Sequence, residues 1–356
     1  MKNTDKQNYE MISRLADSFG PSGFEDEVLQ TAALYTGFAR THTDSMRNMY
    51  IISPRENQNK PTVMLDAHSD EVGFMIHSTA PDGTLRFVPL GPPAKASLPS
   101  SEVLVRNTLG EYINGVISCV PPHYAKEAAG MSLDELRIDI GAASAEEAAA
   151  EYSVGMGEPA VFSTLCKINE ETGTLIGKAF DCRIGCAALI ETMHRLADEE
   201  LGVNICGALS SQEEVGARGV KVSVNRISPD VAICFEGCPA DDTIAPNHAK
   251  QTKLGFGPML RYIDGSMITN PRFQRFALEV AEKYSIPVQT AVRSGSGTDG
   301  SAIHIASKGI PTIVIGIPVR YIHSPACIAK YRDFICAVEL AEAIVKELSS
   351  EIIKGF

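Results

Sequence analysis

The chain has 356 residues, of which 44% are hydrophobic and 21% are charged, a composition typical of an ordinary globular protein with one large or two moderate domains. Its 32 Lys and Arg against 44 Asp and Glu give a formal net charge of −12, which argues against nucleic acid and anionic membranes as partners. A polar N-terminal stretch, no long apolar run and nine scattered cysteines predict a reduced cytoplasmic protein without a membrane span.

The first seventy residues predict two helices and a buried strand. Apolar residues from Tyr9 to Phe19 share one helical face, and a Gly-Pro pair ends the run. We expect a second helix after Ser22, which we interpret as its N-cap with Glu25 in the capping-box position. The short apolar segment 61–68 is typical of a strand that is buried on both faces.

The middle and the end of the chain differ in their sequence patterns. From about residue 72 to 162, short alternating strands are broken by Gly and Pro, which predicts a β-rich module. From residue 175 onward, long helices alternate with apolar strands, which indicates a layered α/β sheet. The expected elements are helices 184–197, 273–284 and 334–348 and strands 203–209, 231–235 and 311–317. We therefore predict one α/β domain built from residues 1–71 and 165–356, with residues 72–164 inserted as a separate domain.

Residues that can bind metals or transfer protons stand at the ends of the expected strands or at the start of a helix. They are His68, Asp70, Asp181, Glu213, Glu214, Glu236 and His323. Ligands in open α/β sheets collect beyond the carboxyl ends of the strands, so these side chains could converge. Two imidazoles and several carboxylates are the donors that a pair of divalent cations of the zinc type needs.

Each candidate also has an ordinary structural interpretation. His68 could simply be hydrogen-bonded at a strand end, although Asp70 could orient its ring as a metal ligand. Asp181 could be a helix N-cap, and Glu213 with Glu214 could lie at a solvated helix N-terminus. In the functional interpretation, one of the adjacent glutamates binds metal and the other accepts a proton.

Other motifs are set aside. The glycine-rich segment 295–300 lacks the Lys-Ser/Thr ending of a phosphate loop, so we interpret it as a tightly turned or mobile loop near the site. Cys182 and Cys186 are four residues apart rather than at the spacing of a zinc knuckle, which favours buried thiols. Structural roles are expected for His77, His194 and His304.

Taken together, these residues resemble the tetrahedral (TET) aminopeptidases, a family of dinuclear-metal peptidases that includes glutamyl aminopeptidases and some members once labelled endoglucanases. The motifs that carry the resemblance are DAHSDEVGF at 66–74, KAFDCRIG at 178–185, SQEEVG at 211–216 and RYIHS at 320–324. The segments 115–117 and 138–142 look like landmarks of the PDZ-like domain that is inserted in this family. The resemblance covers nearly the whole chain.

The resemblance implies an α/β, layered zinc-peptidase-type catalytic domain with an inserted β-rich PDZ-like domain. It implies a metal-dependent aminopeptidase that removes N-terminal residues from short peptides, with two divalent metal ions per subunit. Zinc is the first choice, with cobalt or manganese as alternatives. The resemblance also implies self-association into a tetrahedral dodecamer whose active sites face an interior chamber.

Roles for individual residues follow from the same resemblance. Asp181 bridges the two cations, and Glu213 is the general base; Asp70 joins the catalytic residues because it can hold the far nitrogen of the first histidine ligand. The remaining ligands are His68 and Glu236 for one cation and Glu214 and His323 for the other. The chain departs from the family at three places. Glu236 stands where Asp is common, Cys182 stands where Asp or Asn is usual, and the segment 91–97 departs from the usual glycine and acidic pattern.

Three other functions compete with an aminopeptidase. An amide deacylase of N-acylated small molecules could use the same dinuclear site. A catalytically silent assembly protein could use the acids only as helix caps. A glycosidase ranks last, because the histidines would have no role and the chain has no Trp for sugar stacking.

Overall fold

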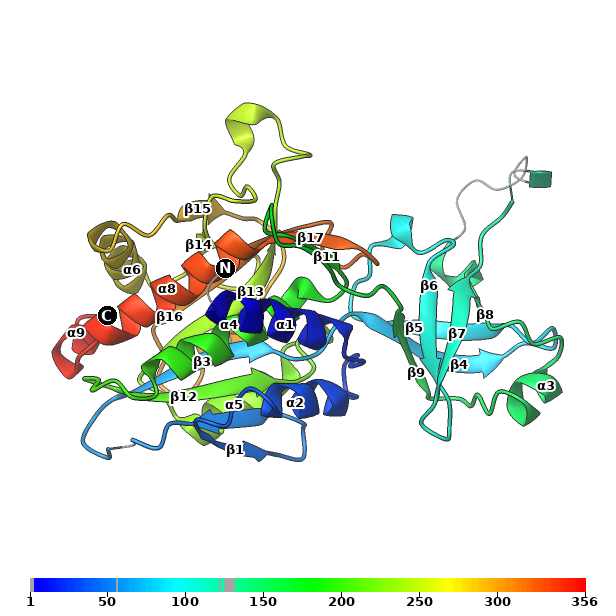
Figure 1. The fold of residues 1–356 in the computed structure, drawn as a ribbon, viewed down its shortest axis with the longest axis horizontal. Helices are drawn as coiled ribbons and strands as arrows, with labels where there is room; N and C mark the ends of the chain where they lie inside the picture. The colour runs from blue at the N-terminus through cyan, green and yellow to red at the C-terminus, as the bar shows by residue number, and fades with distance from the viewer. Residues whose placement is uncertain (1–2, 56, 122, 125–131) are drawn as a thin grey trace.

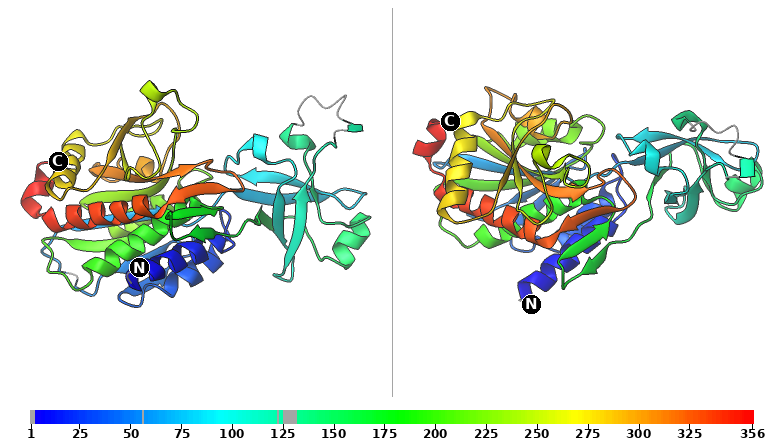
Figure 2. Two further views of the ribbon diagram at one scale, coloured as in Figure 1. Left: turned by 45° about the horizontal axis from the view of Figure 1, so that its top comes forward. Right: turned by 90° about the horizontal axis from the view of Figure 1, so that it is seen from above.

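The computed structural model describes residues 3–55, 57–121, 123–124 and 132–356. Figure 1 shows an α/β body that holds both chain termini and, at one end of it, a β-barrel formed by the middle of the chain. Two further directions of view show the same separation (Figure 2). The mixed α/β fold and the β-rich middle module expected from the sequence are both present.

The sheet of the body has eleven strands in the order β1-β2-β12-β3-β13-β16-β17-β11-β10, with β14 paired to β16 and β15 paired to β14. Its strands are β1 (Arg40–Thr43), β2 (Met49–Ile52), β3 (Thr62–His68), β10 (Lys167–Asn169), β11 (Thr174–Gly177), β12 (Asn204–Ser210), β13 (Val231–Pro239), β14 (Met259–Ile263), β15 (Gln289–Val292), β16 (Thr312–Arg320) and β17 (Cys327–Lys330). The neighbours β12, β3, β13 and β16 are parallel, so their carboxyl ends meet at one edge. These four strands are buried along nearly all of their length, as their continuous apolar runs predict.

Helices cover both faces of this sheet (Figure 1). One face packs against α1 (Asn3–Asp17), α4 (Phe180–Leu196) and α8 (Tyr331–Glu347), which bury the largest apolar cluster of the described residues. The other face packs against α5 (Arg218–Ile227) and α7 (Gly300–Ile303). The remaining helices of the body are α2 (Asp26–Ala33), α6 (Pro271–Lys283) and α9 (Ser350–Lys354). Among the described helices, none has the length and apolar character needed to cross a bilayer.

The barrel is closed, with strand order β4-β5-β8-β7-β6-β9. Its elements are β4 (Gly73–Thr79), β5 (Leu85–Leu90), β6 (Glu102–Arg106), β7 (Tyr112–Ile117), β8 (Ile138–Asp139), β9 (Pro159–Phe162) and the short helix α3 (Ala145–Ala150). It has its own apolar core, in which the Phe74 ring meets Phe87 and Phe162 edge-on at centroid distances of 4.9 and 5.5 Å. The barrel therefore buries its apolar surface separately from the body.

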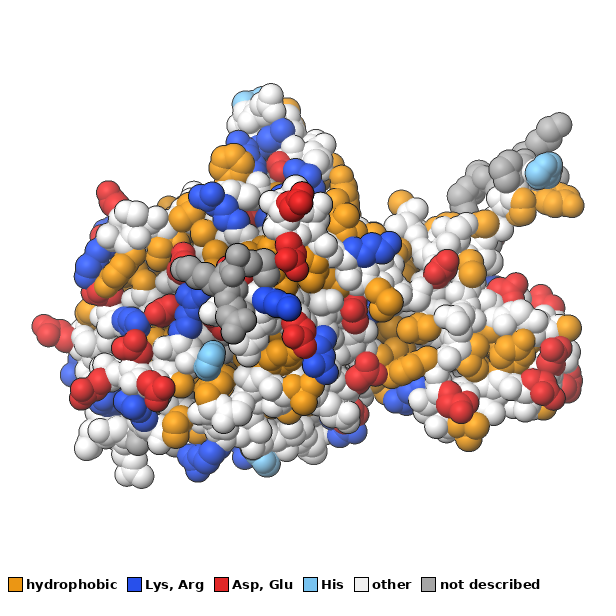
Figure 3. All heavy atoms as spheres, viewed as in Figure 1, with side chains coloured by type: hydrophobic (Ala, Val, Ile, Leu, Met, Phe, Trp, Pro, Cys, Tyr) orange, Lys and Arg blue, Asp and Glu red, His pale blue; other side chains and the backbone are white. Residues whose placement is uncertain are grey.

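Apolar side chains gather where the barrel meets the body, whereas acidic and basic side chains are interspersed over the rest of this face (Figure 3). At this junction the rings of Phe19 and Tyr112 lie 4.8 Å apart. The Tyr112 hydroxyl donates a hydrogen bond of 2.6 Å to Glu27 of α2. Direct contacts thus join the barrel to the N-terminal helices.

The expected capping box at Ser22 is wrong. Helix α2 begins at Asp26, and the side chain of the N-cap residue Glu25 makes no capping hydrogen bond. The Ser22 hydroxyl instead donates a hydrogen bond of 2.5 Å to the buried carboxylate of Asp70, far away in the sequence. The Glu25 carboxylate accepts from the backbone N–H groups of Gly23 and Gln212. Ser22 and Glu25 therefore form hydrogen bonds with tertiary partners instead of capping the start of α2.

Candidate metal centre

Five segments that are far apart in the sequence meet at the carboxyl edge of the parallel strands. They are the end of β3, the start of α4, the loop after β12, the second half of β13 and the loop after β16. The side chains that they bring together are His68, Asp181, Glu214, Glu236 and His323. All five were predicted as metal ligands from the sequence, and the fold brings them into contact.

Asp181 lies at the centre of this cluster. Its Oδ1 is 3.1 Å from Nε2 of His68, which is in turn 3.3 Å from Oε1 of Glu236. Its Oδ2 is 2.9 Å from Nε2 of His323, which is in turn 3.3 Å from Oε1 of Glu214. The two oxygens of one carboxylate thus face two separate groups, and each group contains one imidazole and one further carboxylate.

Backbone geometry aims Asp181 at this point. The residue lies within the first turn of α4, but its φ of −87° and ψ of 107° are not helical. Ala179, two residues earlier, has a left-handed φ of +57°. Gly237 of β13 leaves room for this turn, since a Cβ there would lie 2.8 Å from the Asp181 Cα atom. Asp181 is therefore displaced from the helical path rather than acting as a simple N-cap.

Asp70 connects the first imidazole to the loop after β12. Its Oδ1 lies 3.3 Å from Nδ1 of His68, so a carboxylate is available to orient the ring and leave Nε2 free. The same carboxylate accepts the backbone N–H groups of Glu213 at 2.9 Å and Glu214 at 3.2 Å. One buried acid therefore fixes a histidine and the backbone of both adjacent glutamates.

His323 is held by the connection between β5 and β6 of the barrel. Its Nδ1 lies 3.1 Å from the carbonyl oxygen of Pro92, and its backbone φ of +60° is left-handed. Its own carbonyl accepts the N–H of Ala94 at 2.9 Å. When Nδ1 carries the proton and donates it to Pro92, Nε2 presents the lone pair that a cation binds.

The carboxylates of the cluster are buried, and burial and the neighbouring charged side chains shift their pKa values. Burial would raise the pKa of Asp181, but hydrogen bonds from His323 and His68 hold it well below the usual range. Burial and the charge of Asp181 raise the pKa of Glu236 well above its usual value. The buried Oε2 of Glu236 has no hydrogen-bond partner among the described residues. A carboxylate in this state fits a cation, which supplies the missing partner and favours the charged form.

Cys182 is the fourth member of the group around His68, which the sequence had indicated only as a neighbour of Asp181. Its thiol is fully buried and donates to the carbonyl oxygen of Phe235 at 3.3 Å. Burial raises the pKa of this thiol well above its usual value. The thiol thus supports the backbone of β13, and it lies within 4.8 Å of the other donor atoms of this group.

Two further acids lie behind the cluster and were not singled out from the sequence. Asp66 of β3 and Asp299, which precedes α7, are both fully buried. Burial and then the charge of Asp66 raise the pKa of Asp299 well above its usual range. Asp299 belongs to the glycine-rich segment that we expected near the site. The available signal was the alternation along β3, which directs Asp66 and His68 to the same side of the strand.

A pocket of about 280 Å³ opens beside the cluster. Its lining includes Glu213, which belongs to neither candidate ligand group, together with Arg261 of β14 and Ser296 of the glycine-rich segment. Burial, together with the charges of Glu214 and Asp70, raises the pKa of Glu213 to about 8. A carboxylate with this pKa beside two candidate cation sites is suited to accept a proton.

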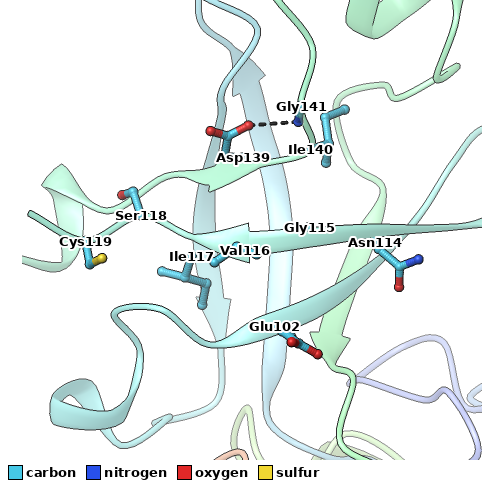
Figure 4. Close-up of a pocket in the computed structure, with 10 residues that line it drawn as sticks. All are labelled: Glu102, Asn114, Gly115, Val116, Ile117, Ser118, Cys119, Asp139, Ile140 and Gly141. Atoms are coloured by element: carbon cyan, nitrogen blue, oxygen red, sulfur yellow. Dashed lines mark hydrogen bonds between the residues drawn. The ribbon is translucent and has the colours of Figure 1, made fainter. Parts of the chain in front are cut away.

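A larger hollow of about 690 Å³ lies on the barrel (Figure 4). It is lined by β7 and the residues that follow it, and by Glu102 and Asp139. None of the clustered ligands lines this hollow, so it is separate from the candidate metal centre.

The three histidines for which structural roles were expected, His77, His194 and His304, lie outside the two ligand groups.

Comparison with known proteins decides the family. Residues 48–340 match the M42 glutamyl aminopeptidase family. The chain belongs to this family. It is therefore a hydrolase that acts on peptide bonds, as the resemblance implied, and the metallopeptidase family implies divalent metals.

Relatives of this M42 aminopeptidase differ in the residue for which they are named. It is 31% identical to a glutamyl aminopeptidase of Lactococcus lactis over 96% of this chain and 97% of that protein. It is also 31% identical to a lysyl aminopeptidase of Pyrococcus furiosus, again over 96% and 97%. The structure of the Pyrococcus horikoshii TET1 peptidase, described as forming a tetrahedron or a large octahedral shell, matches with 30% identity and a TM-score of 0.85 over 96% of this chain and 100% of that chain.

Uptake of Zn²⁺ by the chelator-treated protein should release protons at neutral pH. Burial lowers the pKa of His323, but hydrogen bonds to Asp181 and Glu214 outweigh it and raise the pKa to about 11. The pKa of His68 is likewise raised well above its usual value, against burial, by Glu236 and Asp181. Because a cation binds the neutral imidazole, we expect roughly one proton or more to be released per ion, and weaker binding as pH falls.

Calorimetric titration of Zn²⁺ in buffers of different ionisation enthalpy measures this release. The variant His77→Gln is the matched control, since His77 is an exposed side chain on the barrel. It should release as many protons as the original protein, whereas His323→Gln should release fewer. Zinc uptake without proton release would contradict the prediction.

Proposed function

We propose that the chain is a dinuclear metallo-aminopeptidase that removes N-terminal residues from short peptides. The observation that carries the proposal is the position of Asp181, whose two carboxylate oxygens each face a separate imidazole–carboxylate pair. A single bridging acid with one histidine and one further acid on each side is a donor set for two cations held close together.

In this proposal Asp181 contributes to both cation sites. The ligands that complete them are His68 and Glu236 on one side and Glu214 and His323 on the other. Mixed nitrogen and carboxylate donors fit Zn²⁺, and also Co²⁺ or Mn²⁺. When bound, such cations lower the pKa of a shared water and polarise the carbonyl of the bond to be cleaved.

The protein's own groups then handle the proton. Glu213 lines the same pocket without belonging to either ligand group, so we assign it as the general base that takes a proton from water and returns it to the leaving amine. Asp70 supports this arrangement, because it accepts the Glu213 backbone N–H and faces the ring of His68. We regard Asp70 as a positioning residue.

Domain division and assembly belong to the same proposal. We assign residues 1–71 and 165–356 to the catalytic domain and residues 72–164 to the inserted domain, for which a PDZ-like relationship stays a prediction. Similarity to TET1 peptidase structures, one described as a dodecamer and one as a tetrahedron or a large octahedral shell, supports self-association into a tetrahedral dodecamer. A cytoplasmic location and short peptides as substrates belong to the same proposal. Light scattering of the purified full chain measures the assembly directly.

Metal analysis combined with a substrate panel tests the function. After dialysis against Zn²⁺ and then metal-free buffer, the protein should retain about two ions per chain. It should cleave aminoacyl anilides and leave N-acetylated amino acids intact. Cleavage of the blocked amides alone would instead identify an amide deacylase. Failure to retain a transition metal would identify a silent assembly protein and reject the proposal.

A further inference from the structure

The loop that follows β12 is held by side chains along its backbone. Four consecutive N–H groups, those of residues 211 to 214, donate to side-chain oxygens of Asn48, Glu25, Asp70 and again Asp70, at 2.9, 3.2, 2.9 and 3.2 Å. All three acceptors belong to the first seventy residues of the chain. The loop carries the proposed general base and one of the proposed metal ligands. Its backbone is therefore fixed by long-range contacts.

Gln212 is the residue at which this loop turns. Its φ of +56° lies in the left-handed region, which residues other than glycine rarely adopt. Because the N–H groups of Gln212 and Glu213 are both bound, the peptide planes on either side of the Gln212 Cα atom are fixed. A left-handed conformation at a residue other than glycine persists when its surroundings hold it in this way. The direction in which the chain enters Glu213 therefore depends on both acceptors.

Glu25 is the acceptor on the near side of this turn. Its Oε1 accepts the N–H of Gly23 at 2.8 Å as well as that of Gln212. Its Oε2 is buried and has no hydrogen-bond partner among the described residues. Burial, and after it the charge of Asp70, raises the pKa of the Glu25 carboxyl group to about 7. Ionisation of this group therefore destabilises the folded protein, so stability alone does not explain a glutamate at this position.

We propose that Glu25 is a positioning residue of the reaction, which holds the Gln212 peptide so that the Glu213 side chain faces the substrate pocket. This inference rests on the proposed function. Asp70 alone does not set the same geometry, since it binds the N–H groups after the turn and not the one before it. Without the Glu25 acceptor, the Gln212 peptide should leave its left-handed conformation and misalign Glu213. A misplacement of about 1 Å at a reacting group can lower a rate by about 10²-fold.

Glu25→Met tests the proposal, because methionine nearly preserves the length of the side chain and removes both oxygens. In the zinc-loaded enzyme it should lower kcat for an aminoacyl anilide by about 10- to 100-fold, with little change in KM or in metal content. If Glu25 acts through Glu213, the same change in a Glu213→Gln enzyme should lower kcat by less than about threefold. Equal losses in the two backgrounds would overturn the proposal.

Two further variants separate an acceptor from a merely structural side chain. Glu25→Gln keeps an oxygen that can accept both N–H groups, so it should recover most of the kcat lost in Glu25→Met. Glu27→Met is the matched control, because Glu27 accepts the Phe19 N–H and the Tyr112 hydroxyl rather than an N–H of the loop after β12. Its kcat should stay at the original value. An equal loss of kcat in Glu25→Gln, or in Glu27→Met, contradicts the proposed role.

Hydrogen exchange gives a readout that does not need turnover. Mass spectrometry of the peptide that contains residues 211–216 should show exchange that is about fivefold faster or more in Glu25→Met, since one bound N–H loses its acceptor. Glu25→Gln and Glu27→Met should exchange as the original protein does. If the original enzyme cleaves no anilide, the proposed function fails, and hydrogen exchange still decides whether Glu25 holds the loop. Unchanged exchange in Glu25→Met rejects that role.

Discussion

Replacing Glu213 with glutamine should lower kcat/KM for aminoacyl anilides by about 10²- to 10⁴-fold while the bound metal stays. Glu213 lines the pocket but is not part of either ligand group, so its loss should not empty a cation site. Burial is the main cause that raises the pKa of Glu213 to about 8, so this carboxyl group gains and loses its proton near neutral pH. Cations bound nearby favour its ionised form, which an amide cannot replace as a base.

Metal analysis and steady-state kinetics on the same preparation separate the two effects. Glu213→Asp is the conservative variant, because it keeps a carboxylate on a shorter side chain and should recover part of the lost rate. Asp181→Asn is the contrasting variant, since Asp181 faces both imidazoles and its change should reduce the metal content as well. Full turnover by Glu213→Gln would remove this residue from the mechanism.

The metal cluster was predictable because it depends on topology more than on side-chain detail. Apolar runs with abrupt polar ends mark the parallel strands, and such strands end at one edge of a sheet. His68 and Glu236 follow from that rule without knowledge of loop conformation, whereas His323 lies in the loop after β16 and reaches the cluster through its left-handed backbone and its contact with Pro92. Strand order brings them together, with Ser210 opposite His68 and Glu236 opposite Gly316 in the observed register.

Side chains that depend on long-range contacts were not predictable in the same way. Ser22 and Glu25 match the pattern of a helix start. In the fold, however, Ser22 donates its hydrogen bond to Asp70, and Glu25 accepts one from the backbone N–H of Gln212. The orientation of Arg261 depends on its hydrogen bond to Asp264, and that acid is held by the backbone N–H groups of its own turn, for which the sequence carries no periodic signal. Local patterns cannot rank such partners, because the competing hydrogen bonds have similar free energies and differ only in which groups the fold brings near.

The largest stability effect is expected at Glu71, which lies within the first metal motif, residues 66–74. Its Oε1 lies 2.6 Å from Nζ of Lys178 and 3.1 Å from Nη2 of Arg183, and all three side chains are at most 2% exposed. Glu71→Gln leaves two buried cations without this carboxylate. Breaking a buried ion pair in this way costs about 3–5 kcal/mol in the free energy of unfolding. The loss should also loosen the start of α4, since Arg183 donates to the carbonyl oxygen of Gly20 as well.

Urea denaturation of the chelator-treated protein, followed by circular dichroism, measures this cost without the contribution of bound metal. Glu347→Gln is the matched control, because Glu347 pairs with Lys283 at the same 2.6 Å, but the lysine is 58% exposed. Water screens that surface pair, so its loss should cost at most about 1 kcal/mol. Equal losses in the two variants would mean that the buried triad stabilises the protein no more than a surface contact. A larger loss at Glu71 would mean that the chain folds its first metal motif and the start of α4 around one shared buried charge.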